Sequence, residues 1–295
     1  MDLTSSFRAG FITPPAEVDP VELGTKVYVS VGGLWNRCYL FHGPLMSTAL
    51  NEERPVIMPW KDPLQAKIPQ IRDGYLGAVY YGQRRSGDFY DFVRPTPDRV
   101  LFGLFDVAGD LKQTRDIVIA LQQKFRSAGA LLFEGADVNE PERLLALWIE
   151  INRAVMVAAG GVRSCPAFLG CYNEEIGTLS YVNAGHTPGL VRDMSKIRQL
   201  EATALPLGLF SHSVPDSSVV AVRPGNTFLA VSKGVVEAKY KGEEYGIERV
   251  REYLSQAHFD TAHETCVGVL SKVQQYMCTA PTHNDVTALS VVRNS

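Results

Sequence analysis

Two short acidic stretches could carry metal-dependent chemistry. SGDFYDF places Asp88 and Asp91 three residues apart around a predicted turn, and VLFGLFDVAGD delivers Asp106 at the end of an apolar strand. Hard divalent cations such as Mg²⁺ or Mn²⁺ take oxygen ligands, and carboxylates at strand ends beside glycine can present them. The alternative is that Asp88 and Asp91 cap turns and Asp106 only ends a strand. Spacing alone favours that alternative.

A lysine occupies another strand end. In FLAVSKGVVEAKY, a predicted buried strand is followed directly by Lys233. Strand ends of this kind often carry the side chain that does the chemistry, so a cation at this position bears on any reaction nearby.

Three further residues could contact a phosphate or a proton. His186 in NAGHTP titrates near neutrality and could act as a general acid, but a structural role with hydrogen bonds to the backbone is favoured. Arg84 and Arg85 could grip a phosphate bidentately, although a strand-end pair of arginines is more often solvated. The sequence has no Gly-rich phosphate loop, nucleophile elbow or HExxH, so nucleotide binding, serine hydrolysis and zinc proteolysis have no support.

Composition restricts the class of protein. The 295 residues are 45% hydrophobic and 21% charged, with a formal net charge of −3. Scattered basic residues argue against nucleic acid and a charged membrane surface. No apolar run is long enough to span a membrane and the first residues lack a signal-peptide core, so a cytoplasmic protein is expected. Five widely spaced cysteines without a CxxC pair indicate neither disulfides nor zinc.

The elements that must position these residues follow from periodicity. Residues 1–60 are rich in proline and predict an irregular extension, and residues 61–295 predict one regular domain. Short apolar strands recur from YLGAVYYG to DVTALSVVR. Helices are predicted in two pairs, LKQTRDIVIALQQKF with PERLLALWIEINRAVM, and residues 246–257 with 261–278. Strands in hairpin-like succession with paired helices favour an α+β fold of largely antiparallel sheets.

The order of several motifs from about residue 68 to 293 resembles the SpoIIE-type, RsbU-like branch of the metal-dependent type 2C protein phosphatases. SGDFYDF is similar to the family's GGDFYD, FDVAGD to GDVSGKG, VNAGH to NAGH, SKGVVEA to TDGVTEA and NDVTALSVV to DDVTLLVV. The resemblance covers about three quarters of the chain. It implies a β-sandwich with helices packed on both outer faces, an α-β-β-α arrangement.

The resemblance also implies an activity and a site. The family hydrolyses phosphoserine or phosphothreonine on a partner protein, often an anti-sigma-factor antagonist, with two Mg²⁺ or Mn²⁺ ions that activate a water. By resemblance, Asp106 is the bridging metal ligand and the carbonyl of Val107 lies beside it. Asp88 and Asp91 lie near the centre or orient its waters.

The sequence departs from the family at the metal ligands. Lys233 replaces the aspartate of TDG, Asn284 replaces the first aspartate of the closing pair, and Asp110 and Leu111 replace residues of the metal loop. Asp285 remains but is expected to point the other way along its strand. An ammonium about 4 Å from a divalent ion is repelled by roughly 8 kcal/mol at an effective dielectric of ~20. We therefore expect Lys233 to pair with Asp106 in place of one metal; the alternative is a solvated lysine and one surviving ion.

Three functions follow from these features. The first is a pseudophosphatase or weakly active regulator that binds a partner protein, either a phosphoprotein or a relative of anti-sigma-factor antagonists. The second is an active phosphatase that uses Mg²⁺ or Mn²⁺, and the third is a structural module that self-associates through residues 1–60. Lys233 and Asn284 favour the first function, which needs no cofactor, while Asp88, Asp91 and Asp106 keep the second open. The sequence leaves open whether the chain forms a homodimer.

Overall fold

The chain divides into two units, Met1–Met58 and Pro59–Ser295. The computed structural model describes residues 26–31, 34–39, 66–81, 86–193, 196–256, 260–278 and 285–295. In the first unit, β1 (Lys26–Val31) and β2 (Leu34–Tyr39) pair antiparallel. The rest of the predicted extension lies outside the described residues.

The second unit contains two antiparallel sheets, each of five strands among the described residues. The first sheet has the order β10 (Ser218–Ala221), β7 (Thr178–Ala184), β6 (Ala167–Asn173), β5 (Arg99–Asp110), β4 (Ser86–Thr96). The second has the order β3 (Gly74–Tyr81), β14 (Val286–Arg293), β11 (Thr227–Val231), β8 (Gly189–Arg192), β9 (Ile197–Leu200). The predicted α+β sandwich of two antiparallel sheets is confirmed.

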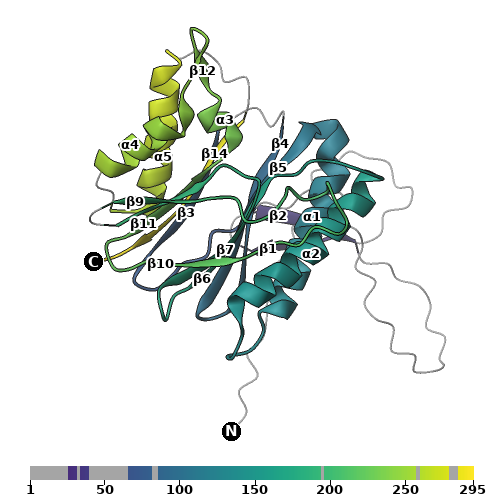
Figure 1. Ribbon diagram of the computed structural model, residues 1–295. Coiled ribbons are helices and arrows are strands. Elements are labelled where there is room, and N and C mark those ends of the chain that lie inside the picture. The colour runs from purple at the N-terminus through teal and green to yellow at the C-terminus, as the bar shows by residue number, and fades with distance from the viewer. Residues whose placement is uncertain are drawn as a thin grey trace, which may run out of the picture. The chain divides into compact units, whose positions relative to one another are not determined.

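Helices cover the outer face of each sheet (Figure 1). The helices α1 (Leu111–Leu132) and α2 (Glu140–Ala159) pack on the first sheet, and α4 (Gly246–Gln256) and α5 (Ala262–Tyr276) pack on the second. The predicted helix pairs therefore form at the predicted places. A one-turn helix, α3 (Lys233–Val236), follows β11, and β12 (Lys239–Tyr240) and β13 (Glu243–Glu244) form a small hairpin after it.

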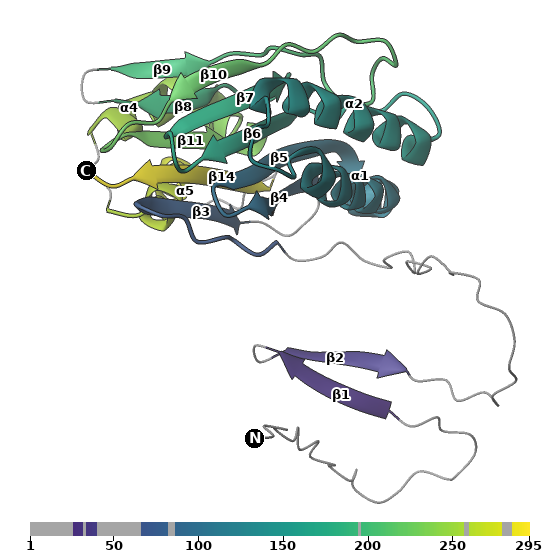
Figure 2. The ribbon, with the colours of Figure 1, turned by 90° about the horizontal axis from the view of Figure 1, so that it is seen from below.

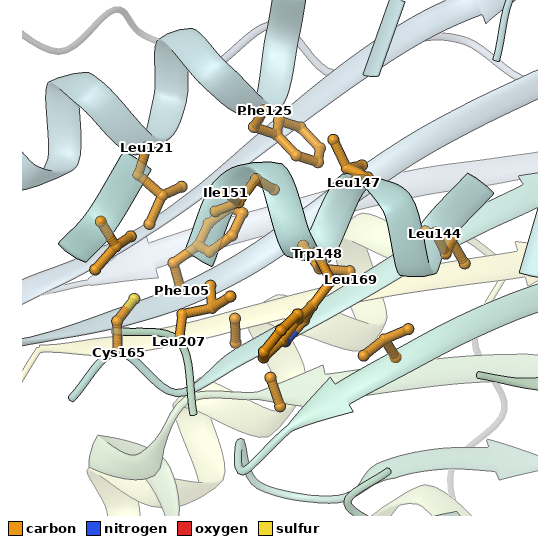
Figure 3. Packing of buried hydrophobic residues seen from close by; sticks show 14 of the residues in the cluster. Phe105, Leu121, Phe125, Leu144, Leu147, Trp148, Ile151, Cys165, Leu169 and Leu207 are labelled. Atoms are coloured by element: carbon orange, nitrogen blue, oxygen red, sulfur yellow. The ribbon is translucent and has the colours of Figure 1, made fainter. Parts of the chain in front are cut away.

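Three hydrophobic clusters bind these layers together. One lies between the first sheet and α1 and α2, where Trp148, Phe105 and Phe125 are almost fully buried (Figure 3). A second lies between the two sheets and contains Phe102 and Phe228, and a third lies under α4 and α5. Because strand side chains alternate between faces, central strands such as β5 and β11 contribute to two of these clusters. No helix in the described part of the chain is both long and apolar enough to cross a membrane.

Candidate metal centre

The β4–β5 hairpin brings two aspartates face to face. Asp88 and Asp106 are direct partners in the antiparallel register of these strands. Side chains of directly opposite residues lie on the same face of the sheet with Cβ atoms ~5 Å apart. Gly87 permits this close pairing, because a Cβ atom on it would lie 2.3 Å from the carbonyl oxygen of Val107. The sequence therefore places two carboxyl groups within hydrogen-bonding reach.

The two carboxyl groups share a proton. Burial, the negative charge of Asp106 and a hydrogen bond with it raise the pKa of Asp88 to about 8, and Asp285 adds to the shift, while a hydrogen bond with Ser232 opposes it. Burial also raises the pKa of Asp106, although its hydrogen bond with Asp88 and the charge of Lys233 lower it. Near neutral pH Asp88 is therefore largely protonated.

Ser232 and Asp285 complete the surroundings of Asp88 from the second sheet. Ser232 follows β11, and its Oγ accepts a hydrogen bond of 3.0 Å from the backbone N–H of Thr287. Asp285 lies just before β14 and is 2% exposed. Along β14, Val286 belongs to the cluster under α4 and α5, whereas Leu289 belongs to the cluster between the sheets. By alternation Asp285 faces the space between the sheets, so the expectation that it points away from the centre is corrected.

Lys233 does not pair directly with Asp106. It is the first residue of α3, its side chain is 59% exposed, and its Nζ lies 3.1 Å from Oε1 of Glu237. The hydrogen bond and the charge of Glu237 raise the pKa of Lys233, and Asp106 contributes less. The expected ion pair between Lys233 and Asp106 is therefore corrected. The helical spacing i,i+4 gives the lysine a nearer acid on its own turn, although its charge still acts on Asp106.

Asp91 lies on the other face of β4. Its carboxylate accepts hydrogen bonds from Nε and Nη2 of Arg126 on α1, at 2.6 and 2.8 Å, and the residue is fully buried. SGDFYDF is part of a strand rather than a turn, and residues three apart on a strand face opposite sides. The expectation that Asp91 joins Asp88 and Asp106 is corrected for this reason.

His186 is neutral and tied to its own loop. Burial lowers its pKa to about 4. Its backbone N–H donates to Oδ1 of Asn183 at 2.8 Å, and its Nδ1 lies 3.2 Å from the carbonyl oxygen of Thr187. These contacts agree with the structural role expected for it. Nε2 is buried and has no hydrogen-bond partner among the described residues.

Several predicted residues lie outside the described part of the chain. These are Arg84, Arg85 and Asn284, together with the side chains of Asp110 and Leu111. One residue near the centre had no signal in the sequence. Nη1 of Arg163 donates a hydrogen bond of 3.0 Å to the carbonyl oxygen of Ala108, two residues after Asp106. Only the folded chain brings this guanidinium to the loop that follows the acid pair.

The donor set fits one hard cation better than two. Within the described ranges, no three His, Cys, Asp or Glu side chains are arranged to hold one ion. Asp106 and Asp88 could take a divalent ion in place of their shared proton, with the backbone carbonyl of Val107 as a further oxygen ligand. If the resemblance of SKG to the family's TDG holds, a second ion would need a ligand at the position of Lys233, and an ammonium there would oppose it. A bound ion would supply a water of lowered pKa.

Comparisons with known sequences agree with this fold. The sequence model of the family described as Stage II sporulation protein E (SpoIIE) matches residues 97–294. Protein IcfG of Synechocystis is 26% identical over 129 residues, which are 43% of this chain and 20% of IcfG. The chain therefore matches about a fifth of that relative's length.

Solved structures with the same fold come from several bacteria. The RsbU and RsbW domains of a Mycobacterium tuberculosis protein match with a TM-score of 0.64 and 19% identity, over 77% of this chain and 62% of that one. The phosphatase domain of SpoIIE from Bacillus subtilis, with a fragment of its regulatory domain, matches with a TM-score of 0.62 and 13% identity. The match covers 76% of this chain and 64% of that one. The SiaA PP2C domain of Pseudomonas aeruginosa matches with a TM-score of 0.60 and 19% identity, over 75% of this chain and 86% of that one.

Proposed function

Because the chain belongs to the SpoIIE family, we propose that it is a phosphatase-fold signalling protein that regulates a partner by binding it, with two-metal catalysis lost. The observation that carries this proposal is Lys233. It stands at the metal-ligand position of the SKG motif, and its charge lowers the pKa of Asp106. A cation whose charge reaches the central carboxylate weakens the binding of a divalent ion there, even though Lys233 pairs with Glu237.

The proposed partner is a phosphoprotein or a relative of the anti-sigma-factor antagonists. Two similar structures support this class: one contains RsbU and RsbW domains, and another, with a TM-score of 0.51, is described as part of the bacterial stressosome. Both belong to other proteins, so the class of partner is carried over from them to this chain as a proposal. A pull-down with a phosphorylated and an unphosphorylated antagonist protein would test it.

A second function, a weak phosphatase with one metal ion, is favoured by a different observation. Asp88 and Asp106 are held together as an acid pair, and a raised pKa marks a site where a cation could replace the shared proton. Lys233 is turned toward Glu237 and does not fill the space between the two aspartates. One ion at this pair would still activate a water for attack on phosphorus.

Hydrolysis of p-nitrophenyl phosphate and of a phosphoserine peptide distinguishes the two functions. The full-length chain is assayed with and without millimolar Mn²⁺, beside Asp106→Ala and Lys233→Asp. The binding function predicts no metal-dependent turnover in the native chain and a gain in Lys233→Asp. Turnover that requires Mn²⁺ and disappears in Asp106→Ala would replace it with the one-metal phosphatase.

Lys239→Asp is the matched control for Lys233→Asp. The Lys239 side chain is 58% exposed and pairs with Glu244 at 3.3 Å, whereas Lys233 is 59% exposed and pairs with Glu237 at 3.1 Å. The two variants therefore change the same charge in the same kind of ion pair. A gain in Lys233→Asp alone identifies the position at the acid pair as the cause, and an equal gain in both would contradict that assignment.

A further inference from the structure

A second polar site lies at the opposite end of the sandwich from the acid pair. It is a pocket of about 400 Å³ lined by Asp193, Lys196, Arg198, Ala221, Arg223, Pro224 and Asn226. Asn226 immediately precedes β11 and Ser232 immediately follows it. Asn226 and Ser232 are six residues apart, so at ~3.3 Å per residue they lie roughly 20 Å from each other. The pocket is therefore distinct from the candidate metal centre.

Two turns on neighbouring sheet edges form the pocket. The turn between β8 and β9 is closed by the backbone N–H of Asp193, which donates to the carbonyl oxygen of Lys196 at 3.0 Å. The turn between β10 and β11 is closed by the backbone N–H of Asn226, which donates to the carbonyl oxygen of Arg223 at 2.9 Å. Figure 2 shows β9 and β10 along the same side of the domain. Backbone hydrogen bonds therefore hold the residues that carry the lining side chains.

The three cations of the pocket are exposed to solvent. Lys196, Arg198 and Arg223 form no ion pair with any carboxylate in the described part of the chain. Asp193 is the one acidic residue among the lining residues, and its Oδ1 accepts a hydrogen bond from the backbone N–H of Lys196 at 2.8 Å. The lining therefore has an excess of positive charge.

Asn226 adds an uncharged polar group to these cations. The residue is only 5% exposed, and its side-chain amide has no hydrogen-bond partner among the described residues. The amide atoms are accessible from the pocket rather than sealed in the core, so they can form hydrogen bonds with a ligand there. Since Asn226 lines the pocket, a ligand there would satisfy it.

We propose that this pocket binds the phosphate group of a small molecule of up to nucleotide size. Arginine binds phosphate bidentately, lysine adds a point charge, and an amide N–H₂ adds donors to the remaining oxygens. A single carboxylate would leave the excess positive charge of the lining largely uncompensated. The volume lies within the range of small-molecule sites, whereas a docking surface for a protein would be wider and flatter.

Calorimetric titration of the full-length chain tests the proposal. Pyrophosphate, ATP and adenosine are titrated in EDTA, so that no divalent ion can bring phosphate to the acid pair. Pyrophosphate and ATP should bind with a one-to-one stoichiometry, and adenosine should not bind. Arg198→Ala and Arg223→Ala should each weaken binding about tenfold through loss of a charge-assisted hydrogen bond. Asn226→Asp should weaken it further by placing a negative charge against the phosphate.

Two control variants make the result decisive. Arg143 on α2 is an exposed arginine outside the pocket, and Arg143→Ala should leave binding unchanged. Asp106→Ala should also leave it unchanged, because the acid pair is at the other end of β11. The proposal is wrong if pyrophosphate does not bind, if Arg143→Ala weakens binding as much as Arg223→Ala does, or if Asp106→Ala abolishes it.

Discussion

Strand β4 carries one fully buried aspartate, Asp91, and one partly exposed aspartate, Asp88, and their environments are opposite. Asp91 faces α1 and α2 and is held by the guanidinium of Arg126 in a bidentate ion pair. Asp88 faces the space between the sheets, where its nearest charged partner is another carboxyl group and its pKa is raised to about 8. Asp91 thus has an ion-pair partner inside the fold, whereas Asp88 forms no ion pair with any cation in the described part of the chain.

This difference separates a structural group from a candidate functional one. A buried carboxylate that only stabilises a fold is normally paired with a cation or with several donors. Asp88 and Asp106 are partly exposed, and two adjacent carboxyl groups with a raised pKa lower the stability of the folded state near neutral pH; such groups are common at functional sites. The contrast therefore assigns Asp91 to the support of β4 against α1, and leaves Asp88 and Asp106 as the candidate functional pair.

The largest effect is expected from removing the cation of the structural pair. Arg126→Ala leaves Asp91 buried and unpaired, which should lower the free energy of unfolding by about 3–5 kcal/mol. Chemical denaturation monitored by circular dichroism measures it. Lys124→Ala is the control, because Lys124 on the same helix pairs with Glu150 at 3.2 Å with both side chains more than a third exposed. That variant should lose less than about 1 kcal/mol.

An equal loss of unfolding free energy in Arg126→Ala and Lys124→Ala would contradict the structural role assigned to the Asp91–Arg126 pair. The double variant Asp91→Leu with Arg126→Met tests the same contrast by removing both charges. Replacing both charges by apolar groups removes the unpaired charge, so the double variant should recover much of the stability that Arg126→Ala loses. Failure to recover would mean that the ion pair itself, rather than the avoidance of a buried charge, fixes α1 on β4.

A smaller effect of opposite sign is expected at the acid pair. Asp88→Asn keeps a donor toward Asp106 and an acceptor for Ser232 but removes a group that ionises in the unfolded chain. In EDTA at pH 7 the raised pKa corresponds to a gain of up to ~4 kcal/mol for this variant, and because Asp88 is partly exposed and screened by solvent we expect about 2 kcal/mol. Thermal and denaturant unfolding at matched pH measure the gain. A loss of stability in Asp88→Asn would show that Asp88 is an ordinary paired carboxylate.

The pH dependence of that gain follows from the direction of the shift. The pKa of Asp88 rises from 3.8 to about 8, so the folded state holds the proton more tightly than the unfolded state does. The contribution of Asp88 to stability is thus fully present below about pH 4 and is lost as the pH rises toward 8. Relative to Asp88→Asn, the native chain should therefore become steadily less stable across this window. A constant difference would contradict the raised pKa.

The sequence predicted the fold more completely than the site. Motif order and helix periodicity gave two antiparallel sheets with paired helices, and the strand-end position of Asp106 indicated a carboxylate centre. The faces of β4 and β14 were not predicted, because SGDFYDF was assigned to a turn and Asp285 was expected to point away. Arg126 lies 35 residues from Asp91, and no local pattern joins them. Glu237, by contrast, could have been recognised from its i,i+4 spacing to Lys233.

The smallest effect on stability is expected from the exposed ion pair between Lys233 and Glu237. Lys233→Ala breaks an ion pair whose side chains are 59% and 35% exposed, so the free energy of unfolding should change by less than about 1 kcal/mol, as in the control Lys239→Ala. The two variants should differ at the acid pair. Because the charge of Lys233 lowers the pKa of Asp106, its removal should raise that pKa, whereas Lys239→Ala should leave it unchanged. Carboxyl ¹³C NMR titration measures the shift. If Lys233→Ala leaves the titration of Asp106 unchanged, the lysine acts only on Glu237, and its place in the SKG motif would no longer explain a weakened metal centre.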